Sequence, residues 1–280
     1  MKGLLVGTGG VPHSAPKPSS QAGIKQIREL GLDCMELAFV RRVAMGEKTT
    51  SEVRQTAEEC EVQVSVHAPY YVNLNSPEAD KVRASRQRIL QAARVGWLCG
   101  AQSIVFHAAS YHDDPPEIVY ERVRGHLVEL VEELRAEGNG AILRPETTGK
   151  VSQFGTLEEL LMLSKEVEGI APCVDFAHLH ARTGADNSYE EFAAFLELIG
   201  GELGQAGLGD MHIHISGIDY GPGGEKAHLN LEDADLRYVE LLQALRDFEV
   251  SGLVICESPN LEEDALLVQR TYRSLAKRRE

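Results

Sequence analysis

Positive charge, aromatic residues and long apolar runs are all scarce in this sequence of 280 residues. Its 28 Lys and Arg are outnumbered by 43 Asp and Glu. The formal net charge of −15 argues against a general polyanion-binding protein, because such proteins cluster positive charge. Bound metal cations could still supply a positive field locally. No stretch approaches the ~18 consecutive apolar residues that a membrane span requires, so we expect no membrane association.

Cysteine is also sparse and unpaired. This pattern is typical of buried free thiols in a reducing compartment rather than of a disulfide framework. The first residues, MKGLLVGTGGVPHSAP, reach Gly and Pro too early for the apolar region of a secretory signal. We therefore expect a cytoplasmic protein whose sequence begins with mature chain. The five cysteines, each single within an apolar segment, are Cys34, Cys60, Cys99, Cys173 and Cys256.

Short apolar runs alternate with longer amphipathic segments along the whole chain, as in parallel strands joined by crossover helices. Eight such units predict one domain over residues 1–280, a (β/α)8 TIM barrel, with a doubly wound open sheet as the alternative. The expected strands are Gly3–Gly7, Met35–Phe39, Gln63–His67, Ser103–His107, Ala141–Glu146, Pro172–Asp175, Met211–Ile215 and Gly252–Glu257. The expected helices are Gln21–Leu30, Ser51–Glu59, Asp80–Leu98, Pro116–Glu137, Thr156–Val167, Tyr189–Ile199, Leu236–Phe248 and Leu261–Lys277.

Ionisable residues stand at the carboxyl ends of six consecutive strands. In a parallel barrel these ends converge on one face, so residues far apart in sequence meet in one cavity. Imidazoles and carboxylates together suit zinc, or manganese if oxygen ligands dominate. A single residue of this kind is more often a structural hydrogen-bonding group, but six in succession favour a metal site. These residues are His67, His107, Glu146, Asp175, His214 and Glu257.

Glu146 lies in the middle of this series and could bridge two ions, as in hydrolytic two-metal sites, so we predict a catalytic role for it. His178 follows Asp175 by three residues and is expected in the loop above the same face. His228 follows a Gly-rich loop and could fold back over the site. His212 shares one side of its strand with the candidate ligand two residues later, and we expect it to give deeper support.

With these residues in place, the chain resembles the endonuclease IV family, zinc-dependent endonucleases for abasic sites in DNA. That family lies within the wider xylose-isomerase-like barrel superfamily. The resemblance spans nearly the whole chain, and its motifs follow the family's order and spacing. The motifs are VHAPYYVNL, FHAAS, PETTG, VDFAH, HIHIS, EKAHLNL and CESP.

The resemblance implies two zinc ions with a hydroxide between them, and hydrolysis of DNA on the 5′ side of an abasic site during base excision repair. We expect a monomer. A third ion is bound in the family by the His of a DxxH motif and by both ends of a DxH motif. Here His178 and His228 match, but Lys226 replaces the Asp of the second motif. Either the Lys226 ammonium takes the place of that ion and binds phosphate, or Glu225 becomes the ligand. The implied ligands are His67, His107 and Glu146 for the first ion, and Glu146, Asp175, His214 and Glu257 for the second.

The resemblance also implies residues that contact the substrate. Tyr70, in the HAPY motif, matches a tyrosine of the family that enters DNA at the lesion. The family's inserted arginine comes from the loop after the second strand, where this sequence offers Arg41 and Arg42.

The alternative is a sugar isomerase or epimerase of the same superfamily, with one divalent metal. His67 and His107 favour the nuclease, since a second ion assists phosphodiester hydrolysis but has no use in a sugar isomerisation. The aromatic content of 6% gives sugar stacking little support. A non-catalytic metal-binding or DNA-binding barrel is a third possibility. The residues that serve both enzymes equally are Glu146, Asp175, His214 and Glu257.

Overall fold

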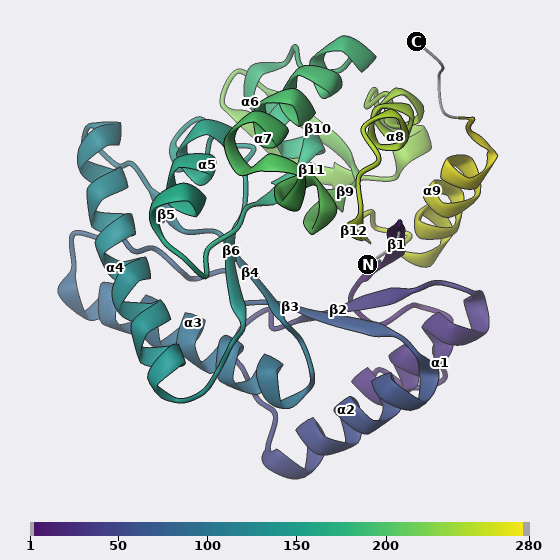
Figure 1. Cartoon of the computed structure of the whole chain (residues 1–280), viewed down its shortest axis with the longest axis horizontal. Coiled ribbons are helices and arrows are strands. Elements are labelled where there is room, and N and C mark those ends of the chain that lie inside the picture. Colours follow the sequence, from purple (N-terminus) through teal and green to yellow (C-terminus); the bar gives the residue numbers. More distant parts are fainter. Residues whose placement is uncertain (1–2, 277–280) are drawn as a thin grey trace.

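The computed structural model describes residues 3–276, and its centre is a barrel of eight parallel strands surrounded by helices (Figure 1). The strands of the barrel are β1 (Leu4–Gly9), β2 (Cys34–Ala38), β3 (Gln63–His67), β4 (Ser103–Phe106), β6 (Ile142–Pro145), β8 (Cys173–Asp175), β9 (Met211–Ile215) and β12 (Gly252–Cys256). They pair in the order β6-β4-β3-β2-β1-β12-β9-β8. Two isolated parallel bridges, Leu143 with Ile170 and Glu146 with Cys173, join the two edges. The predicted (β/α)8 barrel is confirmed, and the sheet is not the open doubly wound type.

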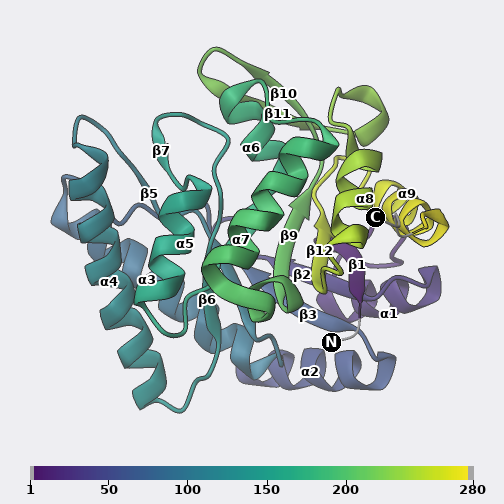
Figure 2. The ribbon, with the colours of Figure 1, turned by 45° about the horizontal axis from the view of Figure 1, so that its top comes forward.

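Helices follow the strands and cover the outside of the barrel (Figures 1 and 2). All eight predicted helices are present with shifted ends, although Lys277, the expected end of the last one, lies outside the described residues. No helix in residues 3–276 combines the length and apolarity needed to cross a membrane. The helices are α1 (Ser20–Leu30), α2 (Glu47–Cys60), α3 (Ala79–Leu98), α4 (Pro116–Ala136), α5 (Leu157–Glu166), α6 (Phe176–Thr183), α7 (Tyr189–Gly209), α8 (Tyr238–Asp247) and α9 (Glu262–Ser274).

Side-chain caps in the sequence set several helix starts. The Ser19 hydroxyl accepts a hydrogen bond from the backbone N–H of Ala22 at the start of α1. Thr156 and Ser188 open α5 and α7 with complete capping boxes, in which a glutamate three residues later bonds back to the cap. Gly204 interrupts α7 with a non-helical conformation, which explains why the sequence pattern ends near Ile199 although the helix resumes beyond it.

The two faces of the barrel strands differ in polarity. Alternate strand residues such as Val66 and Ile213 point outward and join the large apolar core between strands and helices. The inward-facing residues form only a small apolar cluster of Cys34, Leu253 and Ile255. Much of the remaining interior is polar. The outer core therefore supplies most of the apolar burial that stabilises the fold, and the interior is available for chemistry.

Three local features are absent from the sequence prediction: the helix α6, a two-residue ladder of β5 (Ala109–Ser110) with β7 (Gln153–Phe154), and the hairpin of β10 (Gly217–Gly221) with β11 (Gly224–Leu229). The hairpin packs on α6 and rises above the barrel (Figure 2). Gly224 fixes its position, since a Cβ there would lie 2.0 Å from the carbonyl oxygen of Gly149. This contact brings β11 next to the loop after β6.

Candidate metal centre

The carboxylate of Glu146 lies at the centre of the strand ends and is 1% exposed. Its Oε2 lies 2.9 Å from Nε2 of His107 and 3.1 Å from Nε2 of His67. Its Oε1 lies 3.2 Å from Nδ1 of both His178 and His214. Four imidazoles from different segments of the chain therefore surround one carboxylate, and each oxygen faces a separate pair. This is the arrangement expected of a bridging ligand.

Two groups of candidate ligands share Glu146. In each group, one donor atom from every residue lies within 4.8 Å of the others. A carboxylate that belongs to both groups can join two ions into one centre. The first group is His67, His107 and Glu146, and the second is Glu146, Asp175, His214 and Glu257.

Backbone carbonyl groups define the tautomer of three imidazoles. In each, Nδ1 donates its proton to a carbonyl oxygen, so Nε2 presents a lone pair. These lone pairs face an oxygen of Glu146 or another ring nitrogen, and two lone pairs repel unless a cation lies between them. Since these hydrogen bonds occupy Nδ1, each of the three histidines has its Nε2 atom free to bind a metal ion. The bonds are His67 Nδ1 with Ala68 O at 2.8 Å, His178 Nδ1 with Thr147 O at 3.0 Å, and His228 Nδ1 with Glu257 O at 3.3 Å.

Asp175 supplies a buried oxygen that lacks a partner. The residue is 0% exposed, and its Oδ1 accepts the backbone N–H of His178 at 2.8 Å. Its Oδ2 has no hydrogen-bond partner among the described residues. Burial raises the pKa of this carboxyl group. An orphaned carboxylate oxygen beside imidazole lone pairs fits a metal ligand, because coordination satisfies it.

The pKa shifts show that the Glu146 carboxylate and the imidazoles around it stabilise one another's charged forms. Burial disfavours the ionised form of Glu146, but the charges of His107 and His214 hold its pKa well below the ordinary value. Burial likewise disfavours the charged form of His67, yet its hydrogen bond to Glu146 raises the pKa to about 9. Protons thus occupy the cluster when no ion does, and metal binding must displace them.

A third group lies beneath the β10–β11 hairpin. It consists of Asp175, His178 and His228, whose donor atoms lie within 4.8 Å of one another. The Nε2 atoms of the two histidines are 3.3 Å apart. Oε2 of Glu225, on β11, lies 3.6 Å from Nε2 of His178. Glu225 therefore stands where it can add a carboxylate to the two imidazoles.

The structure does not bring Lys226 into this group. Its ammonium lies 3.3 Å from Oδ1 of Asp219 and 2.8 Å from the carbonyl oxygen of Tyr220, and 57% of the side chain is exposed. The reason is a β-bulge: Asp219 pairs with Ala227 and Tyr220 with Glu225, so Lys226 has no opposite residue. Lys226, the predicted substrate contact, thus does not line the pocket in the described residues, whereas Glu225 does.

A pocket of about 390 Å³ opens over the ligand groups. Tyr70 stands at its rim, 55% exposed, with its ring centroid 5.4 Å from that of His67. Arg41 and Arg42 are exposed in the loop after β2, and neither lines the pocket in the described structure. The lining residues are His67, Tyr70, His107, Lys150, Gln153, His178, Glu225, His228 and Glu257.

The sequence prediction missed Glu36, which lies on β2 and is 1% exposed. Its Oε1 lies 3.1 Å from Nε2 of His214, and its Oε2 lies 3.1 Å from Nε2 of His212 and 2.8 Å from the Ser65 hydroxyl. The other ring nitrogen of His212 lies 2.6 Å from the Ser103 hydroxyl. A single acidic residue in the otherwise apolar strand CMELA was the available signal.

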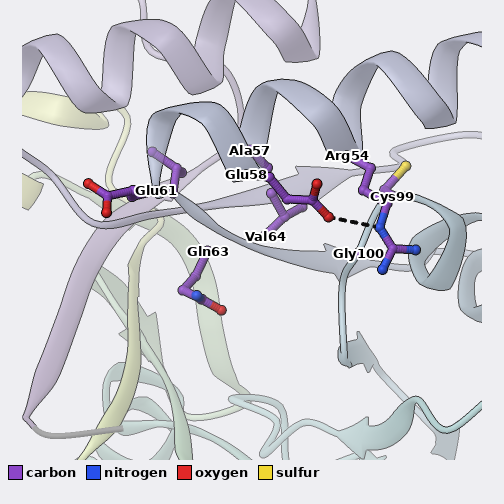
Figure 3. A pocket seen from close by; sticks show the side chains of 9 residues that line it. Arg54, Ala57, Glu58, Glu61, Gln63, Val64, Cys99 and Gly100 are labelled. Atoms are coloured by element: carbon purple, nitrogen blue, oxygen red, sulfur yellow. Dashed lines mark hydrogen bonds and ion pairs between the residues drawn. The ribbon is translucent and has the colours of Figure 1, made fainter.

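Another hollow of similar volume, about 410 Å³, lies at the opposite ends of the strands (Figure 3). Arg54 and Glu58 of α2 point into it and pair with each other, with Nε 3.1 Å from Oε1. Gln63 begins β3 beside them, and Cys99 contributes a thiol whose pKa burial raises to about 12. With its charges already paired, this hollow lacks the converging ligands of the first one.

Comparison with known proteins gives one family over most of the chain. The model described as "Xylose isomerase-like TIM barrel" matches residues 24–277. A protein of Methanocaldococcus jannaschii described as uncharacterized is 42% identical over 273 residues, covering 97% of this chain and 98% of that protein. A probable endonuclease 4 of Carboxydothermus hydrogenoformans is 26% identical over 219 residues, which is 76% of each chain.

Two solved structures resemble this one equally well. Endonuclease IV from Thermus thermophilus has a TM-score of 0.71 at 19% identity and covers 97% of both chains. A D-tagatose 3-epimerase-like protein has a TM-score of 0.71 at 19% identity, covering 98% of this chain and 96% of that one. At such low identity these similarities describe the fold, and the chemistry must be inferred from the site residues.

Proposed function

Because the chain belongs to the xylose isomerase-like TIM barrel family, we propose that it is a zinc-dependent phosphodiester hydrolase that cuts DNA on the 5′ side of abasic sites. One observation carries the proposal. The group of His67, His107 and Glu146 adjoins the second ligand group through the shared carboxylate of Glu146. The similarity to probable endonucleases 4 supports the same conclusion.

The chemistry of phosphodiester hydrolysis explains why two ligand groups are needed. Divalent ions bound there would neutralise the phosphate and lower the pKa of an attacking water toward ~7. Glu146 holds the two groups at a fixed separation through contacts with His67 and His107 of the first group and His214 of the second. His178 and Glu225 extend the polar wall along which the phosphate and the leaving oxygen would lie. A one-metal sugar epimerase would leave His67 and His107 without a role.

Loops that follow three of the barrel strands carry exposed side chains suited to damaged DNA, and Tyr70 among them lines the pocket. Val40, Tyr70, Tyr71 and Val151 are all at least 50% exposed, and they come from the loops after β2, β3 and β6. Apolar side chains of this kind can enter the space left by a missing base, which costs little because the sugar is already unstacked. Lys150 lines the same pocket and provides positive charge. Local cations and bound ions thus offset the net charge of −15.

The proposal is tested with a labelled duplex that contains one tetrahydrofuran abasic analogue. We expect a single cut on the 5′ side of the lesion, leaving a 3′-hydroxyl, with loss of activity in a chelator and recovery with zinc. An intact duplex of the same sequence is the substrate control. The same preparation is assayed for epimerisation of ketohexoses with manganese. Epimerisation without DNA cleavage would establish the sugar enzyme instead.

Metal content provides a second test that does not depend on substrate choice. We expect at least two ions per chain in protein purified without chelator, because the two ligand groups share only Glu146. We also expect a cytoplasmic monomer, and gel filtration tests its oligomeric state. A single ion per chain would contradict the two-metal centre even if DNA cleavage were detected.

A further inference from the structure

A separate cluster of metal-ligating side chains lies deeper in the barrel than the centre around Glu146. The Sγ of Cys173 and one ring nitrogen each of His212 and His214 lie within 4.8 Å of one another, and all three residues are buried. Cys173 on β8 is directly opposite His212 on β9 in the parallel register. Glu36 approaches the two histidines from β2, across the interior. Three candidate ligands, and a carboxylate in contact with two of them, therefore gather where the side chains are almost completely buried.

Three polar atoms around this cluster lack hydrogen-bond partners. Oε1 of Glu36, Nε2 of His212 and Nε2 of His214 are buried and unpartnered in the described structure. Each nitrogen lies 3.1 Å from an oxygen of Glu36, but the ring N–H directions do not align with those oxygens. Buried orphan groups are rare and require an explanation. Two ligands of one tetrahedral ion are separated by roughly 3.3–3.8 Å, slightly more than the 3.1 Å between each nitrogen and its Glu36 oxygen and within the 4.8 Å limit for Cys173, His212 and His214.

We propose that Glu36, Cys173, His212 and His214 bind a zinc-like divalent cation inside the barrel. The ligand set is one thiolate, one carboxylate and two imidazoles, which suits tetrahedral zinc. The two anionic ligands balance the double charge of the ion, as a dry interior requires. The ligands are themselves held: the Ser65 hydroxyl donates to Glu36, and the Ser103 hydroxyl contacts Nδ1 of His212.

His214 connects this interior site to the centre around Glu146. Its Nε2 faces Glu36 at 3.1 Å, while its Nδ1 faces Oε1 of Glu146 at 3.2 Å and Oε2 of Glu257 at 3.4 Å. The two ring nitrogens point to opposite ends, so the ring of His214 can serve both sites as a bridging imidazolate, and its N–H proton is released to solvent when the second of the two ions binds. Because protein side chains supply all four ligands, the interior ion has a structural role and orients His214. This inference does not depend on DNA being the substrate.

The test uses cobalt(II) in place of zinc in the full-length protein after chelator treatment. Cys173 is the thiol within the candidate ligand groups, so only the interior site gives a thiolate-to-cobalt charge-transfer band in the near ultraviolet. We expect this band in the wild type, its loss in Cys173→Ser, and one ion per chain fewer in that variant. Cys34→Ser and Cys256→Ser are matched controls, because both thiols are fully buried but outside the cluster. Both should retain the band.

The possible results separate this inference from the proposed function. A wild-type protein that binds cobalt without the charge-transfer band would overturn the interior site, whether or not it cleaves DNA. Persistence of the band in Cys173→Ser, or its loss in a folded Cys34→Ser variant, would also overturn it. If Cys173→Ser does not fold, His212→Asn is the second variant, and an unchanged number of ions per chain with an unchanged band would count against the site. Circular dichroism establishes folding in each case.

Discussion

The imidazoles of His178 and His228 face each other through their Nε2 atoms at 3.3 Å. Both rings direct Nδ1 to a backbone carbonyl oxygen, so the facing nitrogens are two lone pairs. Such a pair is stable only with a proton or a metal ion between its members. The neighbouring Glu225 carboxylate, 3.6 Å from His178, supplies the negative charge that a metal ion requires.

We therefore predict that Glu225→Ala weakens binding of an ion at the third group by at least about 10-fold, since it removes one of four candidate ligands, the others being Asp175, His178 and His228. Zinc titration by calorimetry, with elemental analysis of the dialysed protein, measures the change. Lys226→Ala is the matched control, because the neighbouring ammonium points to Asp219 and away from the ligands. Equal loss in both variants would mean that the hairpin conformation, and not the carboxylate, matters.

Replacement of His107 by Ala should reduce cleavage of the abasic duplex by at least about 100-fold while the fold persists. The imidazole lies 2.9 Å from Oε2 of Glu146 and is partly exposed, so its removal costs the first ion a ligand but leaves little cavity. Single-turnover rates and a thermal melt are measured together. His126→Ala, on α4 and next to Arg86, should retain wild-type rates. Normal cleavage by folded His107→Ala would rule out the two-metal centre.

Tyr70→Ala should weaken binding of abasic duplex DNA by about 1–3 kcal/mol, which is roughly 5- to 150-fold in Kd. The ring is 55% exposed above His67 and cannot act as a good zinc ligand, so the metal content should not change. Tyr70→Phe keeps the ring and should bind as wild type. If Tyr70→Ala binds the lesion normally, the tyrosine merely covers the rim of the barrel.

Removal of metal should lower the thermal midpoint by about 10 °C. Ions present at 1,000 times their Kd contribute about 4 kcal/mol, and each kcal/mol corresponds to roughly 2–4 °C in a protein of this size. Differential scanning calorimetry before and after chelator treatment gives the shift, and zinc should restore the original midpoint. Magnesium, which prefers oxygen ligands, is the control and should restore little. A midpoint insensitive to chelation would indicate that these residues hold no ion.

The sequence predicted the barrel and the gathering of strand-end residues for one physical reason. Parallel strands place all their carboxyl ends on the same face, so the position of Glu146 or Glu257 at a strand end already defines its location in space. The eight strands need only be recognised as apolar runs. Their ends shift by at most a few residues, because the residue that ends a strand also begins a loop.

Contacts between distant segments were not predictable in the same way. The path of the β10–β11 hairpin depends on Gly224 meeting Gly149 and on a bulge at Lys226, neither of which has a local signature. Glu36 was visible as a charge within an apolar strand, but its partners His212 and His214 are more than 170 residues away. Interactions of this kind arise only when the barrel closes.

The division of the barrel into an apolar outer core and a polar interior has a consequence for the order of assembly. Packing of strands against helices does not involve the polar interior, so the chain can complete its fold before any ion arrives. The open pocket then admits ions to the ligands around Glu146. Cys173 and His212 lie below that layer, and an ion must reach them while the upper ligands are still free. The interior site would then bind its ion before the ligands around Glu146 bind theirs. If the ligands around Glu146 bound ions first, those ions would block the path by which an ion enters or leaves the interior site.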